Sequence, residues 1–331
     1  MDIFPTQYSL LSSKALGVFL ADQYNLKGIN CRLLIHNVSD TYILESEASK
    51  YIFKIYRDKH RKLEEIKAEV ELLNLIYEQG GSVAQPLKDI HKDEIQTFTT
   101  AEGTRYGVLF TYALGKVSAN MSDEQLATVG EEMAKVHNIT SSITLKHQRR
   151  EYSLHTMLFK PIEVFKPAFD DLPEEYLFLE QAVKQVAKKI EALNFHNFSY
   201  GYCQYDFLPK NFHFTDEGKV TFFDFDFAGK GYLINDISSF YIHYFLEVYF
   251  GKITQNEADR AFSVFVAHYR KVRPLSEEEL AVIPYFGFAF WIFYLGFQYE
   301  NFEDWSNFFF GHKYLKERTT LIKKWMEWYI K

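Results

Sequence analysis

The first third of the chain contains short apolar runs bounded by polar and turn-forming residues, a pattern typical of β-strands. These runs cover residues 31–35, 41–46, 50–56, 94–100 and 106–112. Turn-forming residues at 37–40 separate the first two runs, and Glu102 with Gly103 separates the last two, which predicts two hairpins. The short connections predict antiparallel pairing of these strands.

Helical periodicity predicts the other elements. The expected helices cover residues 9–24, 59–79, 123–137 and 174–193. Gly80 and Gly81 end the second helix. From Ser122 onward the chain is mostly helical, except for a strand-rich part at 200–227 with a turn at 215–218, and helices rich in Phe, Tyr and Trp follow Asp236.

This order predicts an α+β fold with two lobes. An antiparallel sheet with one main helix would form a nucleotide-binding lobe at residues 1–112. Residues 113–331 would form a helical lobe that carries the reactive groups and the acceptor site, with Gly115 as a hinge. A nucleotide cleft between the lobes is the architecture that this order implies.

Composition narrows the class of protein. The 331 residues are 47% hydrophobic and 24% charged, as in ordinary globular proteins. A net charge of −7 argues against a nucleic-acid partner. The only cysteines, Cys31 and Cys203, are expected to be reduced thiols. The N-terminus lacks the pattern of a signal peptide. The apolar stretch at 286–297 is too short to span a bilayer. We expect a cytoplasmic protein with no membrane partner.

The strongest chemical pattern lies in the second half of the chain. Asp206 is followed five positions later by Asn211, and Asp224 comes thirteen positions after that, in a run expected to be a strand. Phosphoryl transfer needs one carboxylate beside the acceptor hydroxyl, and an amide oxygen with a second carboxylate for Mg²⁺. Asp226 is an alternative ligand, because alternation would place it on the same side as Asp224. Asp236 is expected to cap the next helix.

The N-terminal part offers partners for nucleotide phosphates. Lys54 lies in the middle of an apolar strand, where an unpaired ammonium is costly to bury, so we expect it to meet anions. Glu69, on the following helix, could hold Lys54 in place. The alternative for Lys54 is an edge position with its ammonium in water. Competing partners for Lys54 are Glu64, Glu65 and Glu71.

Two further segments are expected to contact the nucleotide. The turn at 36–40 contains no glycine, yet its backbone N–H groups and the Ser39 hydroxyl could cover phosphates. The adenine is expected to meet backbone groups after Phe110, at Thr111, Tyr112 and Ala113.

With these residues the chain resembles the aminoglycoside phosphotransferase and choline kinase superfamily, which has a protein-kinase-like fold. The resemblance covers residues 16–236. The superfamily loop usually reads His-Gly-Asp, four variable residues and Asn, and a strand with Ile-Asp follows. Here Gln204 and Tyr205 stand in place of His and Gly. The C-terminal helices look like the bacterial branch that includes homoserine kinase type II and the stress-response kinase.

The resemblance implies roles for individual residues. Asp206 would be the catalytic Asp, Asn211 and Asp224 the Mg²⁺ ligands, and Lys54 with Glu69 the phosphate-binding ion pair. The expected activity is ATP- and Mg²⁺-dependent transfer to a hydroxyl of a small molecule such as an aminoglycoside, choline or homoserine. The alternatives are a Ser/Thr protein kinase of the same fold and a nucleotide-binding regulatory module without turnover.

The acceptor is expected to bind between the Asp206 loop and the C-terminal helices. Acidic residues there would suit an amine, and aromatic rings could hold a cation. The alternative is core packing, or surface solvation in the case of Glu300. The candidates are Tyr241, His243, Trp291, Tyr294, Gln298 and Glu300.

Overall fold

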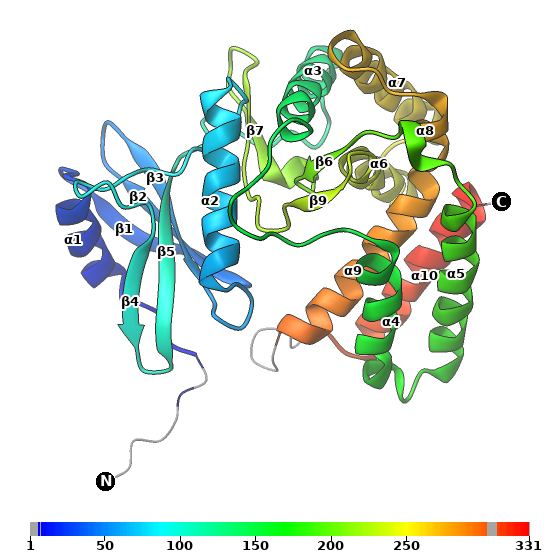
Figure 1. Ribbon diagram of the computed structural model, residues 1–331, viewed down its shortest axis with the longest axis horizontal. Helices are drawn as coiled ribbons and strands as arrows, with labels where there is room; N and C mark the ends of the chain where they lie inside the picture. Colours follow the sequence, from blue (N-terminus) through cyan, green and yellow to red (C-terminus); the bar gives the residue numbers. More distant parts are fainter. Residues whose placement is uncertain (1–5, 7, 303–309, 331) are drawn as a thin grey trace. The chain divides into compact units, whose positions relative to one another are not determined.

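The computed structural model describes residues 6, 8–302 and 310–330. The chain divides into two compact units (Figure 1). The N-terminal unit comprises Met1–Leu114 together with Leu145–Gln148, and the C-terminal unit comprises Gly115–Thr144 together with Arg149–Lys331.

A five-stranded antiparallel sheet in the order β1-β2-β3-β5-β4 forms the N-terminal unit. Its strands are β1 (Asn30–His36), β2 (Ser39–Glu45), β3 (Lys50–Tyr56), β4 (Gln96–Thr100) and β5 (Gly103–Thr111). The predicted strands and their antiparallel pairing are confirmed. The β1–β2 connection is shorter than predicted, because Ser39 and Asp40 already pair with β3 as part of β2.

Two helices accompany this sheet, α1 (Ser13–Gln23) and α2 (Leu63–Glu78). Helix α1 begins later than predicted because the Ser12 side chain caps it by accepting the N–H of Ala15 at 3.4 Å. Ser9, predicted to be helical, instead donates its hydroxyl to Glu102. The apolar side of α1 packs on the sheet in a buried core. That core contains Leu16, Leu20, Tyr42, Leu44, Phe53, Ile55 and Leu109.

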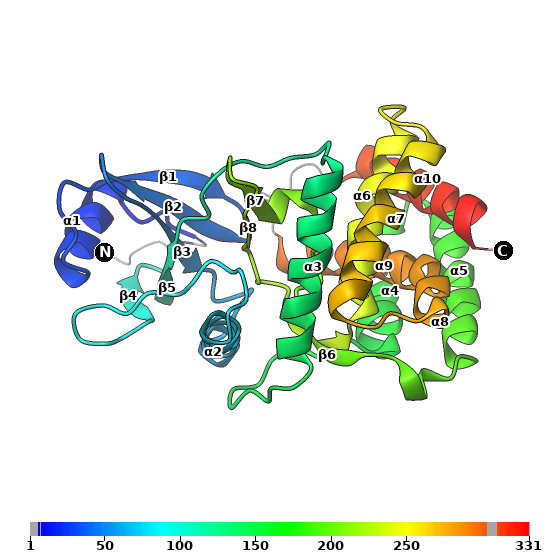
Figure 2. The same ribbon diagram turned by 90° about the horizontal axis from the view of Figure 1, so that it is seen from above.

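The C-terminal unit is mainly helical (Figure 2). Its helices include α3 (Asp123–Thr140), α4 (Lys160–Val164), α5 (Pro173–Glu191), α6 (Ile234–Tyr249), α7 (Gln255–Val272), α8 (Glu277–Ala281), α9 (Ile283–Asn301) and α10 (His312–Tyr329). Helix α9 is buried on most of its circumference and packs against α4, α6 and α10, which explains its nearly continuous apolar sequence. No helix in the described ranges has the apolar length needed to cross a bilayer.

Two short antiparallel pairs interrupt the helices of this unit. Strand β6 (Tyr200–Cys203) pairs with β9 (Gly229–Tyr232), and β7 (Phe212–Phe214) pairs with β8 (Val220–Phe222). The predicted turn joins β7 and β8, where Gly218 adopts a φ of 78° and its N–H donates to the Thr215 carbonyl. The segments between β6 and β7 and between β8 and β9 carry the candidate reactive groups.

Candidate active site

Asp206 lies in the loop between β6 and a short 3₁₀ turn at Pro209–Asn211. The residue is only 4% exposed. Asn211 Nδ2 donates to the Asp206 carbonyl at 2.7 Å and to its Oδ2 at 3.1 Å. The other carboxylate oxygen, Oδ1, is buried without a hydrogen-bond partner in the described part of the chain. The predicted Asp–Asn pair is therefore brought together, with one oxygen of Asp206 still able to accept a proton or hydrogen bond.

Lys210 is a member of this cluster that the sequence pattern did not single out. Its Nζ lies 2.8 Å from Asp206 Oδ2, although its side chain is 56% exposed. Burial lowers the pKa of Lys210, but the charge of Asp206 and a hydrogen bond to it raise the pKa above its usual value. Lys210 therefore stays protonated at neutral pH. Its position one residue before Asn211, inside the Asp–Asn motif, was the available signal.

Tyr205 occupies the position where the resemblance predicts glycine, and its backbone explains that preference. Its φ is 72°, in the left-handed region that glycine adopts without strain. The Tyr205 N–H donates to Asp236 Oδ1 at 2.6 Å, and the ring stacks on Tyr152 with centroids 3.7 Å apart. The surrounding contacts therefore hold a tyrosine in a conformation that usually requires glycine.

Asp236 has a different role from the helix cap predicted for it. The cap of α6 is Leu233, and Asp236 lies inside the first turn. Its carboxylate instead accepts the N–H groups of Gln204 at 2.9 Å and Tyr205 at 2.6 Å, and lies 3.1 Å from His137 Nε2. This buried carboxylate therefore fixes the backbone directly before Asp206.

Gln204 connects the two reactive segments. It is buried, and its Nε2 donates to the Phe223 carbonyl at 2.7 Å. Phe223 directly precedes Asp224, so this hydrogen bond ties the Asp206 loop to the segment after β8. Gln204 thereby supports the loop from the position where the resemblance predicts histidine.

Asp224 and Asp226 do not share one side of a strand, contrary to the prediction. Strand β8 ends at Phe222, and Asp224 follows in a left-handed conformation with a φ of 60°. This backbone breaks the alternation, so Asp224 is exposed whereas Asp226 is buried. Arg149 donates to the backbone carbonyls of Phe225 and Asp226, which holds the segment in this shape.

The oxygen atoms of Asn211 and Asp224 are suited to a hard divalent cation. The Asn211 amide nitrogen is directed at Asp206, which leaves the amide oxygen for a ligand. Mg²⁺ is commonly held by one or two protein oxygens together with phosphate oxygens and water. Within the described residues there is no cluster of three His, Cys, Asp or Glu side chains. The donor set therefore fits a metal that arrives with a phosphate ligand.

Lys54 and Glu69 are both buried in the N-terminal unit. Lys54 lies in β3, opposite Thr41 and Val108, and its Nζ is 5.0 Å from the centroid of the Tyr56 ring. Because β2 and β5 flank β3 on its two sides, the alternative of an edge position for Lys54 is wrong. Its pairing with Glu69 stays a prediction.

The three competing glutamates have other partners. Glu64 lies 2.8 Å from Lys67 Nζ and 2.9 Å from His147 Nδ1. Glu71 accepts the backbone N–H of Lys146, and Glu65 accepts that of Lys62. Glu69, by contrast, is among the buried residues of α2, and the three competitors are not.

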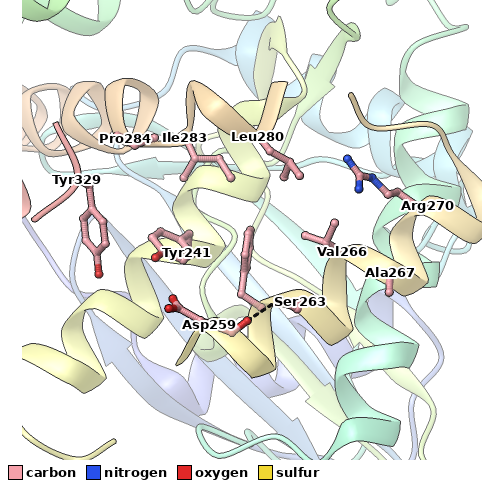
Figure 3. A pocket seen from close by; sticks show the side chains of 11 residues that line it. Tyr241, Asp259, Ser263, Val266, Ala267, Arg270, Leu280, Ile283, Pro284 and Tyr329 are labelled. Carbon is pink, nitrogen blue, oxygen red and sulfur yellow. Dashed lines mark hydrogen bonds between the residues drawn. The ribbon is translucent and has the colours of Figure 1, made fainter. Parts of the chain in front are cut away.

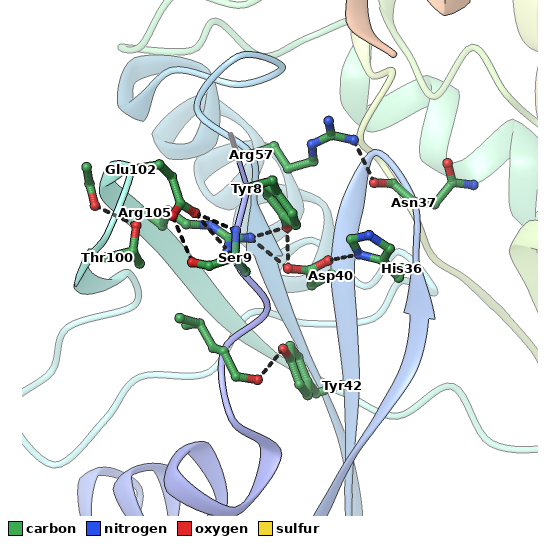
Figure 4. Close-up of polar contacts among 12 residues, drawn as sticks. Tyr8, Ser9, His36, Asn37, Asp40, Tyr42, Arg57, Thr100, Glu102 and Arg105 are labelled. Atoms are coloured by element: carbon green, nitrogen blue, oxygen red, sulfur yellow. Dashed lines mark hydrogen bonds and ion pairs between the residues drawn. The ribbon is translucent and has the colours of Figure 1, made fainter. Parts of the chain in front are cut away.

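The turn predicted to cover phosphates is held by a buried polar cluster (Figure 4). Asp40 is fully buried and lies 2.7 Å from Arg105 Nη2 and 2.6 Å from His36 Nδ1, and Tyr8 also donates to it. Ser39 is buried at the start of β2. The turn is therefore anchored on its β2 side, which limits how far Ser39 can move toward a ligand.

The proposed adenine-contact segment begins at the end of β5. Thr111 donates its N–H to the Gln85 carbonyl, and its Oγ1 accepts the Gln85 N–H, both at 2.9 Å. These groups of Thr111 are thus already engaged. Tyr112 and Ala113 follow, and the assignment of this segment to adenine stays a prediction.

Three of the acceptor-site candidates share one face of α9. Trp291, Tyr294 and Gln298 follow one another at helical spacing, and Tyr314 of α10 donates its hydroxyl to Gln298 Oε1 at 2.6 Å. Burial raises the pKa of the Tyr294 phenol, on which the charges of Lys210, Asp206 and Arg318 also act. This face of α9 is therefore within electrostatic reach of the Asp206 loop.

The other candidates have different surroundings. Tyr241 lines a separate cavity of about 520 Å³ formed by residues of α6, α7, α8, α9 and α10 (Figure 3). His243 lies 3.0 Å from the carbonyl of Ala119, and Glu300 is exposed and lies 3.2 Å from Lys160 Nζ. Among the described residues, these contacts do not link the three candidates to Asp206.

Comparison with known proteins finds a matching family model and several similar proteins. A model described as the phosphotransferase enzyme family matches residues 31–275. An uncharacterized protein of Synechocystis sp. is 30% identical over 243 residues, which are 72% of this chain and 67% of that protein. Amicoumacin kinase of Bacillus subtilis is 25% identical over 224 residues, which are 66% of this chain and 64% of that protein.

Solved structures agree on the fold. A microcompartment-associated aminopropanol kinase has a TM-score of 0.74 at 18% identity, covering 94% of this chain and 95% of its own. An amicoumacin kinase in complex with AMP-PNP, Ca²⁺ and its ligand has a TM-score of 0.73 at 20% identity, covering 96% of this chain and 94% of its own. These likenesses confirm the predicted α+β, protein-kinase-like fold.

Proposed function

This chain belongs to the phosphotransferase enzyme family, and from that premise we propose that it transfers the γ-phosphoryl group of ATP to a hydroxyl group of a small molecule in a Mg²⁺-dependent reaction. It is a phosphotransferase with an alcohol group as acceptor; the nucleotide, the metal and the reacting residues are the proposed part.

The observation that supports the proposal most directly is the asymmetric environment of the Asp206 carboxylate. Oδ2 is engaged by Lys210 and Asn211, while Oδ1 is buried and has no partner within the described residues. An unpartnered buried carboxylate oxygen is costly unless a ligand satisfies it. An acceptor hydroxyl that donates its proton to Oδ1 would remove that cost.

The reaction needs little covalent chemistry from the protein. Asp206 Oδ1 accepts the hydrogen bond of the acceptor alcohol and orients its oxygen for in-line attack on the γ-phosphorus. As the new P–O bond forms and the bond to the leaving ADP breaks, the hydroxyl proton passes to Asp206. Lys210 holds the carboxylate in position and offsets negative charge beside it.

Nucleotide and metal are assigned to the remaining predicted residues. Asn211 and Asp224 would hold Mg²⁺, which on a nucleotide neutralises phosphate charge and orients the phosphates. Lys54, positioned by Glu69, would contact the phosphates. Ser39 and the backbone of Thr111, Tyr112 and Ala113 would complete the nucleotide contacts.

The relatives' names favour small molecules over proteins as acceptors. Amicoumacin kinase, aminopropanol kinase and a homoserine kinase of Paramagnetospirillum magneticum that is 24% identical are all named for small compounds. The regulatory-module alternative draws on Gln204 in place of histidine and on the glycine-free turn at 36–40. Because Gln204 makes a supporting hydrogen bond of its own, this replacement gives no reason to expect lost turnover.

The test compares wild type with Asp206→Asn, which keeps the shape of the side chain and removes its basicity. ADP release with a panel of small alcohols should depend on Mg²⁺ and fall about 100- to 10,000-fold in the variant, as expected for loss of a general base. Equal ADP release by both proteins would contradict the assignment of Asp206. Labelled phosphate that appears in proteins of a lysate rather than in metabolites would favour a protein kinase.

A further inference from the structure

A cationic cluster of Trp291, Tyr314 and Arg318 lies where α9 packs against α10. The Arg318 guanidinium lies over the Trp291 ring at 4.9 Å and over the Tyr314 ring at 5.1 Å. Its Nη2 donates to the Tyr314 hydroxyl at 3.2 Å. Since Tyr314 in turn donates to the buried Gln298, the two rings and the guanidinium form one ordered assembly.

Arg318 lacks an acidic partner in the described part of the chain. The ion pairs there involve other residues, and Arg318 Nε is buried with no hydrogen-bond acceptor. Trp291 Nε1 is likewise buried without an acceptor, in a residue that is only 3% exposed. The half-buried Arg318 thus carries a positive charge and a buried Nε–H, and the neighbouring Trp291 a buried Nε1–H, without acceptors for these N–H groups among the described residues.

Such an arrangement is unfavourable in the absence of a ligand. Buried polar groups are nearly always hydrogen-bonded, and a buried charge normally has a counter-ion. Stacking between two rings partly offsets the loss of water around a guanidinium, but it leaves the in-plane N–H groups without acceptors. A planar anion with two oxygen atoms matches the geometry of a guanidinium edge.

Electrostatic interactions relate this cluster to the proposed reacting groups. Tyr294 lies on the same face of α9 as Trp291 and Gln298, and the charges of Lys210, Asp206 and Arg318 all act on its phenol. Asp206 is already neutralised by Lys210 at 2.8 Å, so the charge of Arg318 is not needed there. Arg318 thus adds a positive charge that acts on the same phenol as the reacting carboxylate.

We propose that Arg318, with Trp291, binds a carboxylate of the acceptor, so that the substrate is an alcohol that also carries a carboxylate group. This inference rests on the proposed function. It adds a carboxylate to the expected features of the acceptor, while Glu300, the acidic candidate for holding an amine, lies near Lys160 at the surface.

The experiment uses pairs of acceptors that differ only by the carboxylate. Serine is compared with ethanolamine, homoserine with propanolamine, and threonine with isopropanolamine. ADP release and phosphorylated product are measured with the full chain, ATP and Mg²⁺. We expect at least one carboxylated member to have a kcat/KM about 10-fold or more above that of its partner, which is the discrimination expected from a charge-assisted hydrogen bond.

Variants then test whether Arg318 and Trp291 cause the preference for carboxylated acceptors. Arg318→Met keeps a side chain of similar length over Trp291 and should lower kcat/KM for the carboxylated acceptor about 10- to 100-fold, mainly through KM. The same variant should change kcat/KM for the decarboxylated partner by less than about 3-fold. Trp291→Phe keeps a ring and removes the N–H, so its effect should be smaller and in the same direction. Arg260→Met, at an exposed ion pair with Asp123, is the matched control.

The outcomes separate this inference from the proposed function. Transfer to amino alcohols without preference for any carboxylated partner overturns the inference and leaves the phosphotransferase assignment intact. An equal loss on both members of a pair in Arg318→Met assigns that residue a structural role and also overturns it. If no compound gives ADP release above Asp206→Asn, the proposed function fails. Calorimetric binding of the same pairs then decides the inference: tighter binding of a carboxylated member, lost in Arg318→Met, supports it, and equal binding overturns it.

Discussion

Replacement of Tyr205 by glycine sets two opposing effects against each other. The φ of 72° costs an L-residue about 1–2 kcal/mol, and glycine would remove that strain. The ring, however, is 1% exposed, stacks on Tyr152 and contacts Phe293 with ring centroids 4.9 Å apart. Loss of a buried aromatic side chain costs about 3–5 kcal/mol.

The two effects can be separated with Tyr205→Phe as the reference. Phenylalanine keeps the ring and the strain but removes a hydroxyl that is buried without a hydrogen-bond partner in the described chain. We therefore expect Tyr205→Phe to be as stable as wild type or about 1 kcal/mol more stable. Relative to Tyr205→Phe, Tyr205→Gly should be less stable by about 1–4 kcal/mol, because the ring contributes more than the strain costs.

Urea unfolding followed by tryptophan fluorescence measures this difference. All four tryptophans lie beyond residue 290, so the signal reports on the C-terminal unit that contains Tyr205. Midpoints and slopes of the three proteins give the differences in unfolding free energy. A Tyr205→Gly protein as stable as Tyr205→Phe, or more stable, would refute the reasoning, since strain would then outweigh packing.

Three further substitutions test other polar contacts in the structure. Lys210→Met should lower kcat about 10- to 100-fold in initial-rate assays. Because the pKa of Lys210 is raised, deprotonation of this residue should cause no loss of wild-type activity below about pH 10. Asp236→Asn should reduce unfolding free energy by about 1–3 kcal/mol in urea, since one loop N–H loses its carboxylate acceptor. Arg105→Met should cost about 3–5 kcal/mol by leaving the buried Asp40 carboxylate without its guanidinium partner, whereas Arg105→Met with Asp40→Leu should restore most of that loss in thermal melts.

Much of the fold was predictable because its periodic patterns are strong. The apolar run of β3 and the turn before β8 each follow from local residue types, and both elements are present. Element ends were less predictable. Helix α1 begins at Ser13 because Ser12 caps it, and a competing contact between Ser9 and Glu102 joins residues far apart in the sequence.

In the site too, features that depend on local spacing were predictable and features that depend on remote residues were not. Asp206 and Asn211 could be found by their spacing, and the hydrogen bonds between them are local. The separation of Asp224 from Asp226 could not, because it depends on a left-handed residue that precedes a segment bound by Arg149, which is remote in the sequence. Lys210 was missed although it lies inside the motif, since a lysine in an exposed turn is usually a solvated residue.

The supports of the reactive loop show why a missing motif residue need not mean a missing activity. The fold requires that the backbone before Asp206 adopt a left-handed conformation and that the loop be tied to the segment of Asp224. Glycine meets the first requirement through its own freedom, whereas here the Asp236 carboxylate and the Tyr152 ring impose the conformation on Tyr205. Gln204 meets the second with one hydrogen bond to the Phe223 carbonyl. Because the contacts that hold both supports come from residues outside the motif, the motif can change while the geometry of Asp206 is kept, and the reactive group itself is the better guide to function.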